Sequence, residues 1–261
     1  MNNNGRSIDL AEIKSLSKGA AYIVLASLSC LLFSTFTPPL LTPQAASRIP
    51  LLGALPGDLP GYWARFALSF LLFGVAPAAM ALHFREKPTA LGINFRTPVL
   101  RKPWFWLLVP LAALGGAVGA ISLDLGSFYP YSRDLIGRVR ESGLGPFFGH
   151  YAAYFFLYYV PWEFFFRGFL LFPFLIAAER VLAIAKADRN PACGMVLFQT
   201  MPSTMGHLGH PLPELVAAVT AGVFFGVLAW KTRSIIPGLL LHAAMGFGTD
   251  LFIVCKGAGY F

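Results

Sequence analysis

Long apolar blocks separated by short polar segments dominate the chain. A membrane-spanning helix needs about 20 consecutive apolar residues, and seven blocks reach or approach that length. They cover residues 19–36, 62–82, 103–123, 146–178, 191–207, 214–230 and 234–254. We therefore predict an all-α fold, a polytopic transmembrane helix bundle of about seven spans.

This pattern suggests one continuous membrane domain with short ends. We assign residues 1–18 to a cytoplasmic tail, 19–145 to N-terminal transmembrane helices and loops, 146–254 to a membrane core, and 255–261 to a second tail. The chain shows no internal repeat and no low-complexity tract.

Composition supports the membrane assignment. Hydrophobic residues make up 56% of the chain and charged residues only 12%, whereas soluble domains carry about 25% charged residues. The net charge of +8 might indicate a nucleic-acid partner, but the basic residues flank apolar blocks and form no single patch. We expect membrane lipids as partners and no nucleic acid. The three cysteines lie far apart and predict neither a metal site nor a disulfide framework.

Loop charge predicts the orientation. With a cytoplasmic N-terminus, the five Lys and Arg residues in outside segments are Arg48, Arg133, Arg138, Arg140 and Lys256, and thirteen lie in inside segments. Because cytoplasmic segments are enriched in Lys and Arg, we predict an integral membrane protein with its N-terminus in the cytoplasm and its C-terminus outside.

Small residues and prolines predict details of the helices. The Gly115–Gly119 run and the Ala218, Gly222 and Gly226 stripe favour close helix packing. The block 146–178 is longer than one upright helix needs, so it tilts or bends at a proline, Pro161 or Pro173. Arg65 lies near one end of its span, where its side chain can reach the interface.

The most informative polar residues lie inside apolar blocks. Glu163 and Arg167 are four apart, so on a helix they share a face and can pair. An isolated charge at mid-bilayer costs at least about 2.5–3.5 kcal/mol, which makes such residues functional candidates. His207 and His242 lie in similarly apolar surroundings, and Asp250 follows His242 on the same predicted helix.

A carboxylate with two histidines has two common chemical uses. The carboxylate can activate water while a histidine positions the water or stabilises an oxyanion. Alternatively, Glu163, His207 and His242 can hold a divalent metal such as zinc. We prefer the first use and expect no cofactor, because a guanidinium beside a metal is unfavourable. A structural ion pair between Glu163 and Arg167 is the non-catalytic alternative.

Three further polar residues are expected around the same cavity. Asp250 is eight residues beyond His242, about 12 Å along a helix, so the two side chains cannot bond but can line one cavity. His210 lies at a predicted break, near the surface, and we interpret it as mainly structural. Glu214 opens the next helix, where a carboxylate suits the N-terminal dipole.

The order of these motifs resembles the CAAX prenyl protease type II family, also called the CAAX protease and bacteriocin-processing family. That family shows Glu-Glu-x-x-x-Arg, then Phe-x-x-x-His, then His-x-x-x-Asn or Asp on successive helices. The corresponding stretches here are 162–168, 203–207 and 242–246. A bacterial subgroup with Trp-Glu-Phe-Phe-Phe-Arg-Gly is closer still, and it matches His207-Leu208-Gly209, Pro211, Glu214 and Asp250. The resemblance covers roughly residues 146–254.

The resemblance implies an intramembrane endopeptidase, a hydrolase of membrane-associated peptides or proteins in a bacterial cytoplasmic membrane. It implies that Glu163 activates water with His207, that His242 stabilises the oxyanion, and that Arg167 orients Glu163. Three positions depart from the family pattern: Trp162 replaces the first Glu, Ser203 the Phe, and Gly246 the Asn or Asp. One position is about 100° of helix rotation, so Glu163 points elsewhere unless the helix is locally wound differently.

Two rival functions remain open at this point. Trp162, Ser203 and Gly246 favour a catalytically inactive membrane scaffold of the same fold. A proton-coupled transporter can use Glu163 and the two histidines as a relay, although transporters are commonly built from repeats. The catalytic interpretation also requires the helix before His207 to be short or broken, because a full-length span would place His207 near the outer surface.

Overall fold

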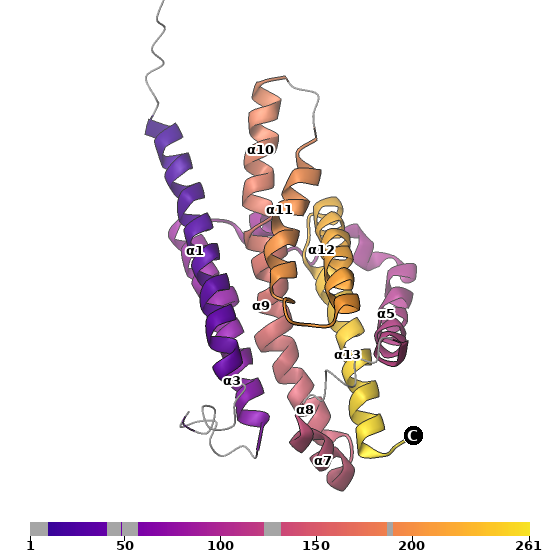
Figure 1. The fold of residues 1–261 in the computed structure, drawn as a ribbon. Coiled ribbons are helices and arrows are strands. Elements are labelled where there is room, and N and C mark those ends of the chain that lie inside the picture. Colours follow the sequence, from indigo (N-terminus) through magenta and orange to yellow (C-terminus); the bar gives the residue numbers. More distant parts are fainter. Residues whose placement is uncertain (1–9, 41–47, 49–56, 123–131, 187–189) are drawn as a thin grey trace, which may run out of the picture.

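The computed structural model describes residues 10–40, 48, 57–122, 132–186 and 190–261, and in these ranges it contains helices and no strand (Figure 1). The all-α prediction is thus confirmed. The N-terminal half contains α1 (Leu10–Leu40), α3 (Leu59–Ser69), η1 (Phe70–Val75), α4 (Ala76–His83), η2 (Pro88–Leu91), η3 (Pro98–Arg101) and α5 (Pro103–Ser122). The first nine residues of the predicted tail lie outside the described ranges.

The C-terminal half begins with α7 (Arg133–Ser142) and continues through one long helical run. This run comprises α8 (Gly145–Tyr154), η4 (Phe155–Tyr159), α9 (Val160–Glu163) and η5 (Phe164–Phe169), and α10 (Phe172–Ile184) follows after a turn. The remaining elements are α11 (Ala192–Met205), α12 (Leu212–Thr232) and α13 (Ile236–Ala258). The break before α10 lies next to Pro173, one of the two prolines at which a bend was predicted.

Five helices are long and apolar enough to cross a membrane, by length and composition. They are Leu16–Thr37, Leu59–His83, Pro103–Ile121, Leu212–Thr232 and Ile236–Ala258, and each coincides with a predicted span. The other two predicted spans, 146–178 and 191–207, are helical but do not meet that criterion in the described chain. In Figure 1 the start of α1 and the C-terminus lie at opposite ends of the bundle. The cytoplasmic side stays a prediction.

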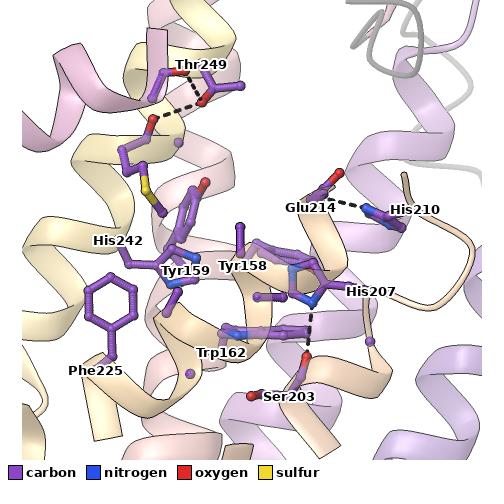
Figure 2. A pocket seen from close by; sticks show the side chains of 18 of the residues that line it. Tyr158, Tyr159, Trp162, Ser203, His207, His210, Glu214, Phe225, His242 and Thr249 are labelled. Atoms are coloured by element: carbon purple, nitrogen blue, oxygen red, sulfur yellow. Dashed lines mark hydrogen bonds and ion pairs between the residues drawn. The ribbon is translucent and has the colours of Figure 1, made fainter. Parts of the chain in front are cut away.

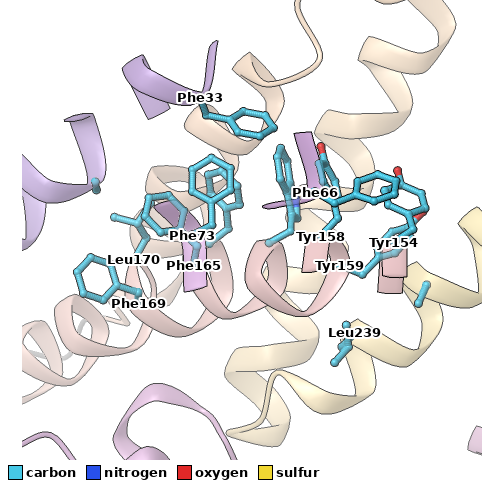
Figure 3. Close-up of a cluster of buried hydrophobic side chains, with 14 of the residues drawn as sticks. Phe33, Phe66, Phe73, Tyr154, Tyr158, Tyr159, Phe165, Phe169, Leu170 and Leu239 are labelled. Atoms are coloured by element: carbon cyan, nitrogen blue, oxygen red, sulfur yellow. The ribbon is translucent and has the colours of Figure 1, made fainter. Parts of the chain in front are cut away.

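The helical run 145–169 forms the centre of the bundle (Figure 1). All residues from 161 to 172 are buried, although the sequence here is rich in large aromatic side chains. Aromatic rings of this run pack against α1 and α3–η1. The Phe73 ring contacts both Phe33 and Phe165, with ring centres 4.8 Å and 4.6 Å away (Figure 3). Large apolar side chains elsewhere, such as Leu107 on α5, stay exposed as expected for a lipid-facing surface.

The central run is not a regular α-helix. Its η4 and η5 segments are π-helical, and such segments occur often at functional sites. A π-helical turn holds more residues than an α-turn, so it rotates every later side chain relative to the regular α-helical register. This local winding decides the direction in which Trp162, Glu163 and Arg167 project.

Glycines allow the close helix contacts that the sequence predicted. A Cβ atom on Gly116 would lie 1.9 Å from the carbonyl oxygen of Met245, and one on Gly248 would lie 1.7 Å from that of Ala113. The hydroxyl of Thr249 donates to the Gly116 carbonyl at 3.0 Å. Backbone contact of this kind fixes α13, and therefore His242, against α5.

An acidic link outside the spans joins the start of α3 to α7. The Asp58 carboxylate accepts hydrogen bonds from the Ser132 hydroxyl and, at 2.8 Å, from the backbone N–H of Arg133. The Asp58 backbone N–H donates to the Asp134 carboxylate at 2.8 Å. Partial burial raises the pKa of the Asp58 carboxyl.

Candidate active site

A fully buried carboxylate lies at the heart of the central run. Glu163 has no exposed surface, and its Oε1 atom lies 3.2 Å from Nη1 of Arg167 and 2.7 Å from Nδ1 of His242. The predicted pairing of Glu163 with Arg167 is therefore present. The contact with His242 crosses from the central run to α13.

His242 is held on three sides. Its ring stacks on Phe225 of α12, with centroids 5.2 Å apart, and meets Tyr159 edge-on at 5.0 Å. A carboxylate between a guanidinium and an imidazole is an acceptor, so His242 donates through Nδ1. Its Nε2 atom is then left with a lone pair. This is the arrangement in which a buried carboxylate orients a histidine base.

His207 reaches the same region because α11 is short. The helix ends at Met205 after 14 residues, and the turn that follows lies well inside the length of the bundle (Figure 1). The catalytic interpretation requires the helix before His207 to be short or broken, and α11 meets this requirement. Nδ1 of His207 lies 3.1 Å from the Ser203 carbonyl oxygen, which only accepts, so Nε2 of this histidine also keeps its lone pair.

Both histidines line one cavity of about 330 Å³. Figure 2 shows His242 with Phe225 and Tyr159 on one side, and His207 with Trp162 and Ser203 on the other. This volume is at the lower end of the range for small-ligand pockets, about 300–1,000 Å³. Of the predicted site residues, the walls include Arg167, His207, His210, Glu214, His242 and Asp250.

Glu163 is the one predicted site residue that does not reach this cavity. Its side chain is fully buried behind Arg167 and His242, so a water molecule in the cavity does not touch its carboxylate. The geometry therefore favours a supporting role for Glu163, acting through His242.

His210 and Glu214 form a second carboxylate–histidine pair on the cavity wall. Nδ1 of His210 lies 2.8 Å from Oε1 of Glu214 (Figure 2). His210, which was expected near the surface and around the cavity, is half-buried on the cavity wall. Glu214 lies in the first turn of α12, as expected for a carboxylate near a helix N-terminus.

Two departures from the family pattern are matched by glycines. Trp162 lies where the first Glu of the motif would be, and a Cβ atom on Gly206 would lie 2.7 Å from its ring. A Cβ atom on Gly246 would lie 1.7 Å from the Tyr159 hydroxyl. Each large aromatic group therefore occupies space that a side chain at the facing position would need.

The alternative metal set does not fit this geometry. Oε1 of Glu163 is already shared by Arg167 and His242, and a guanidinium beside a divalent cation is repulsive. Within the described ranges, no group of three or more His, Cys, Asp or Glu side chains is arranged to hold a metal ion.

The sequence reasoning overlooked three residues on the cavity wall. Tyr158 and Tyr159 line it from η4, and Arg65 lines it from α3. The available signal was a pair of tyrosines just before Pro161 and a lone cation within an apolar span. The position of Arg65 near one end of its span predicts a side chain that reaches the membrane interface.

Comparison with protein families places this site in context. Residues 145–248 match the model of the family described as type II CAAX prenyl endopeptidase Rce1-like. The comparisons with curated proteins and with solved structures found no match. The matched segment contains the central run, the three histidines of the cavity wall and the dyad that joins Glu163 to His242. Residues 145–248 of this chain are therefore similar to the type II CAAX prenyl endopeptidase Rce1-like family.

Proposed function

We propose that this protein is an intramembrane endopeptidase that hydrolyses a peptide bond in the cavity between α11, α12, α13 and the central run. The single observation that carries the proposal is the 2.7 Å contact of His242 with the fully buried Glu163. It gives the cavity an oriented imidazole whose conjugate acid is stabilised by a neighbouring negative charge.

In this proposal His242 is the general base. Its Nε2 atom takes a proton from a water molecule while the water oxygen forms a bond to the scissile carbonyl carbon. The resulting imidazolium is balanced by Glu163. The same proton then passes to the leaving nitrogen as the carbon–nitrogen bond breaks, so His242 returns to its neutral form.

Two further groups complete the site. His207 offers Nε2 as a second acceptor that orients the attacking water. The Tyr159 hydroxyl, on the wall above Gly246, is an O–H donor for the oxyanion. These roles differ from those that the family resemblance implied, in which Glu163 is the base and His242 the oxyanion donor, because Glu163 does not reach the cavity.

An inactive membrane scaffold is the second candidate, and Trp162 favours it. This large ring fills wall space between Gly206 and the aromatic core, where the family motif has a carboxylate. A scaffold would keep the cavity as a binding site for a membrane-associated partner without cleaving it.

A cleavage assay with the purified protein separates the two candidates. The substrates are membrane-anchored and prenylated peptides. The test variant is His242→Gln, and the control is His83→Gln, which changes an exposed histidine outside the cavity. Loss of a general base typically lowers the rate about 10²–10⁴-fold. We expect this loss for His242→Gln and parental cleavage for His83→Gln. Equal cleavage by both variants, or binding of peptides without any cleavage by the parent, would favour the scaffold.

A further inference from the structure

An unpaired carboxylate lies on the cavity wall. Asp250 of α13 is only 6% exposed and lines the cavity. It forms no ion pair or hydrogen bond with any residue that the structure describes, whereas the other carboxylate on the wall, that of Glu214, contacts His210. Charged side chains inside membrane spans are costly and almost always paired. The missing partner of Asp250 is therefore expected to come from a ligand.

Close packing holds the segment that carries Asp250. The two preceding residues of α13, Gly248 and Thr249, both touch α5: a Cβ atom on Gly248 would lie 1.7 Å from the Ala113 carbonyl oxygen, and the Thr249 hydroxyl donates to the Gly116 carbonyl at 3.0 Å. Thr249 lies at the top of Figure 2. The carboxylate is thus presented to the cavity by a fixed piece of backbone.

Small residues border the cavity near this segment. On α5, Gly115 and Gly119 flank Gly116, and a Cβ atom on either would meet nothing within 4 Å. The facing residues of α12 on the cavity wall are also small, namely Ala217, Ala218, Ala221 and Gly222. Walls of this kind suit a slim, unbranched group that ends in a positive charge.

A metal ion is a poor candidate for that charge. Ca²⁺ takes six to eight oxygen ligands, and Mg²⁺ demands an octahedral set. Asp250 supplies a single carboxylate, and the neighbouring Thr249 hydroxyl is already bonded to the carbonyl oxygens of Gly116 and Met245. A Lys side chain needs no such set, because it is a compact ammonium on a flexible four-carbon stem.

We infer that Asp250 binds the ammonium group of a Lys side chain in the peptide substrate. The inference rests on the proposed function and adds to it a specificity for basic peptides. Asp250 lies about 12 Å from His242 along α13. The Lys stem and one or two residues of extended chain, at about 3.3–3.6 Å each, span this distance. The Lys is therefore expected within about two residues of the scissile bond.

The experiment uses membrane-anchored peptides that carry one Lys, moved a single position at a time, and matched peptides in which Met replaces that Lys. Equilibrium binding is measured in the His242→Gln background, and KM and kcat are measured in the parent. The test variants are Asp250→Asn and Asp250→Glu. The control is Glu141→Gln, which changes an exposed carboxylate outside the cavity.

We expect the Lys peptide of one register to bind about 10–100-fold more tightly than its Met partner, as a hydrogen bond between charged groups provides. Asp250→Asn should abolish this preference through Kd and KM. Asp250→Glu should keep part of it, and Glu141→Gln all of it. No preference in any register, or an equal preference after Asp250→Asn, would overturn the inference.

A structural role for Asp250 predicts a different result in thermal unfolding without peptide. If the carboxylate stabilises the fold, Asp250→Asn should lower the unfolding temperature and weaken the Lys and Met peptides equally, and this outcome would also refute the inference. The binding role predicts an unfolding temperature at or above that of the parent, because an unpaired buried carboxylate destabilises the folded state.

The headgroup of phosphatidylethanolamine is another source of an ammonium group, and a second arm tests it. Unfolding and binding are repeated in phosphatidylcholine bilayers with and without phosphatidylethanolamine. If this lipid stabilises the protein only when Asp250 is present, and the peptides bind alike, the peptide assignment is wrong. Failure of the proposed function is distinguishable, because the peptides would then stay uncleaved while the Asp250-dependent preference persists in Kd.

Discussion

The buried pair of Glu163 and Arg167 allows stability and catalysis to be tested separately. Glu163→Gln keeps an amide oxygen for the Nδ1–H of His242. It removes the negative charge between the Arg167 guanidinium and the His242 imidazole. Removing one partner of a buried ion pair typically costs about 3–5 kcal/mol, because the other charge stays buried. Since Gln retains one acceptor, we expect a loss near the lower end of that range.

The double variant Glu163→Gln/Arg167→Met removes both charges together. Replacing a buried ion pair by neutral groups of similar volume is often neutral or stabilising by about 1–4 kcal/mol, so this variant should recover most of the lost stability. Met can keep apolar contact with Phe225, which lies 5.8 Å from the guanidinium. Cleavage should stay about 10²–10⁴-fold below the parent, because His242 still lacks its carboxylate.

The assay measures unfolding in detergent and peptide cleavage on the same preparations of parent, single and double variants. Recovery of both stability and cleavage in the double variant would show that Glu163 matters only as the partner of Arg167. Parental cleavage by a stably folded Glu163→Gln would refute the dyad altogether.

Further outcomes are expected at other points of the molecule. Gly246→Ala should lower stability and cleavage, because its Cβ would lie 1.7 Å from the Tyr159 hydroxyl; Tyr159→Phe leaves a nearest ring atom at 2.7 Å and should recover part of the stability. The raised pKa of Asp58 means that the folded protein binds this proton more tightly, so thermal stability should fall as pH rises from about 4 towards 7. Asp58→Asn should reduce this dependence of thermal stability on pH. An unchanged dependence would contradict its assignment to the Asp58 carboxyl. Cleavage should survive metal chelators, and stoichiometric zinc in the purified protein would reverse this expectation. A cysteine at Lys87 should be labelled only from the cytoplasmic side, and labelling from outside would reverse the predicted orientation.

Hydropathy and small residues were sufficient to predict the helical architecture. Five predicted spans coincide with helices that can cross a membrane, because apolar length is a property of sequence alone. Gly116 and Gly222 lie at close helix contacts, since a Cβ on either would come within 3.0 Å of a facing helix. These features depend on local composition and need no knowledge of how the helices are wound.

The arrangement of the site could only partly be predicted. The pairing of Glu163 with Arg167 follows from their spacing. The direction of Glu163 towards His242 also depends on the π-helical segment η4 before it, which no simple repeat predicts. The place of His210 on the cavity wall depends on where α11 stops. Arg65 was overlooked because a cation near the end of a span is ordinarily explained by reaching the interface.

The shortness of α11 also has a consequence for the surrounding bilayer. A helix of 14 residues rises about 21 Å, against a hydrocarbon core of about 30 Å. Lipid in contact with α11 would therefore have to thin, or its headgroups to sink towards the turn that carries His207. Hydrophobic mismatch of this kind would bring the aqueous phase closer to the cavity, where the proposed hydrolysis needs water, and it would couple the protein to acyl-chain length. Bilayers of shorter lipids would match this face with less deformation, so membrane thickness itself becomes a variable that sets where in a cell such a protein accumulates.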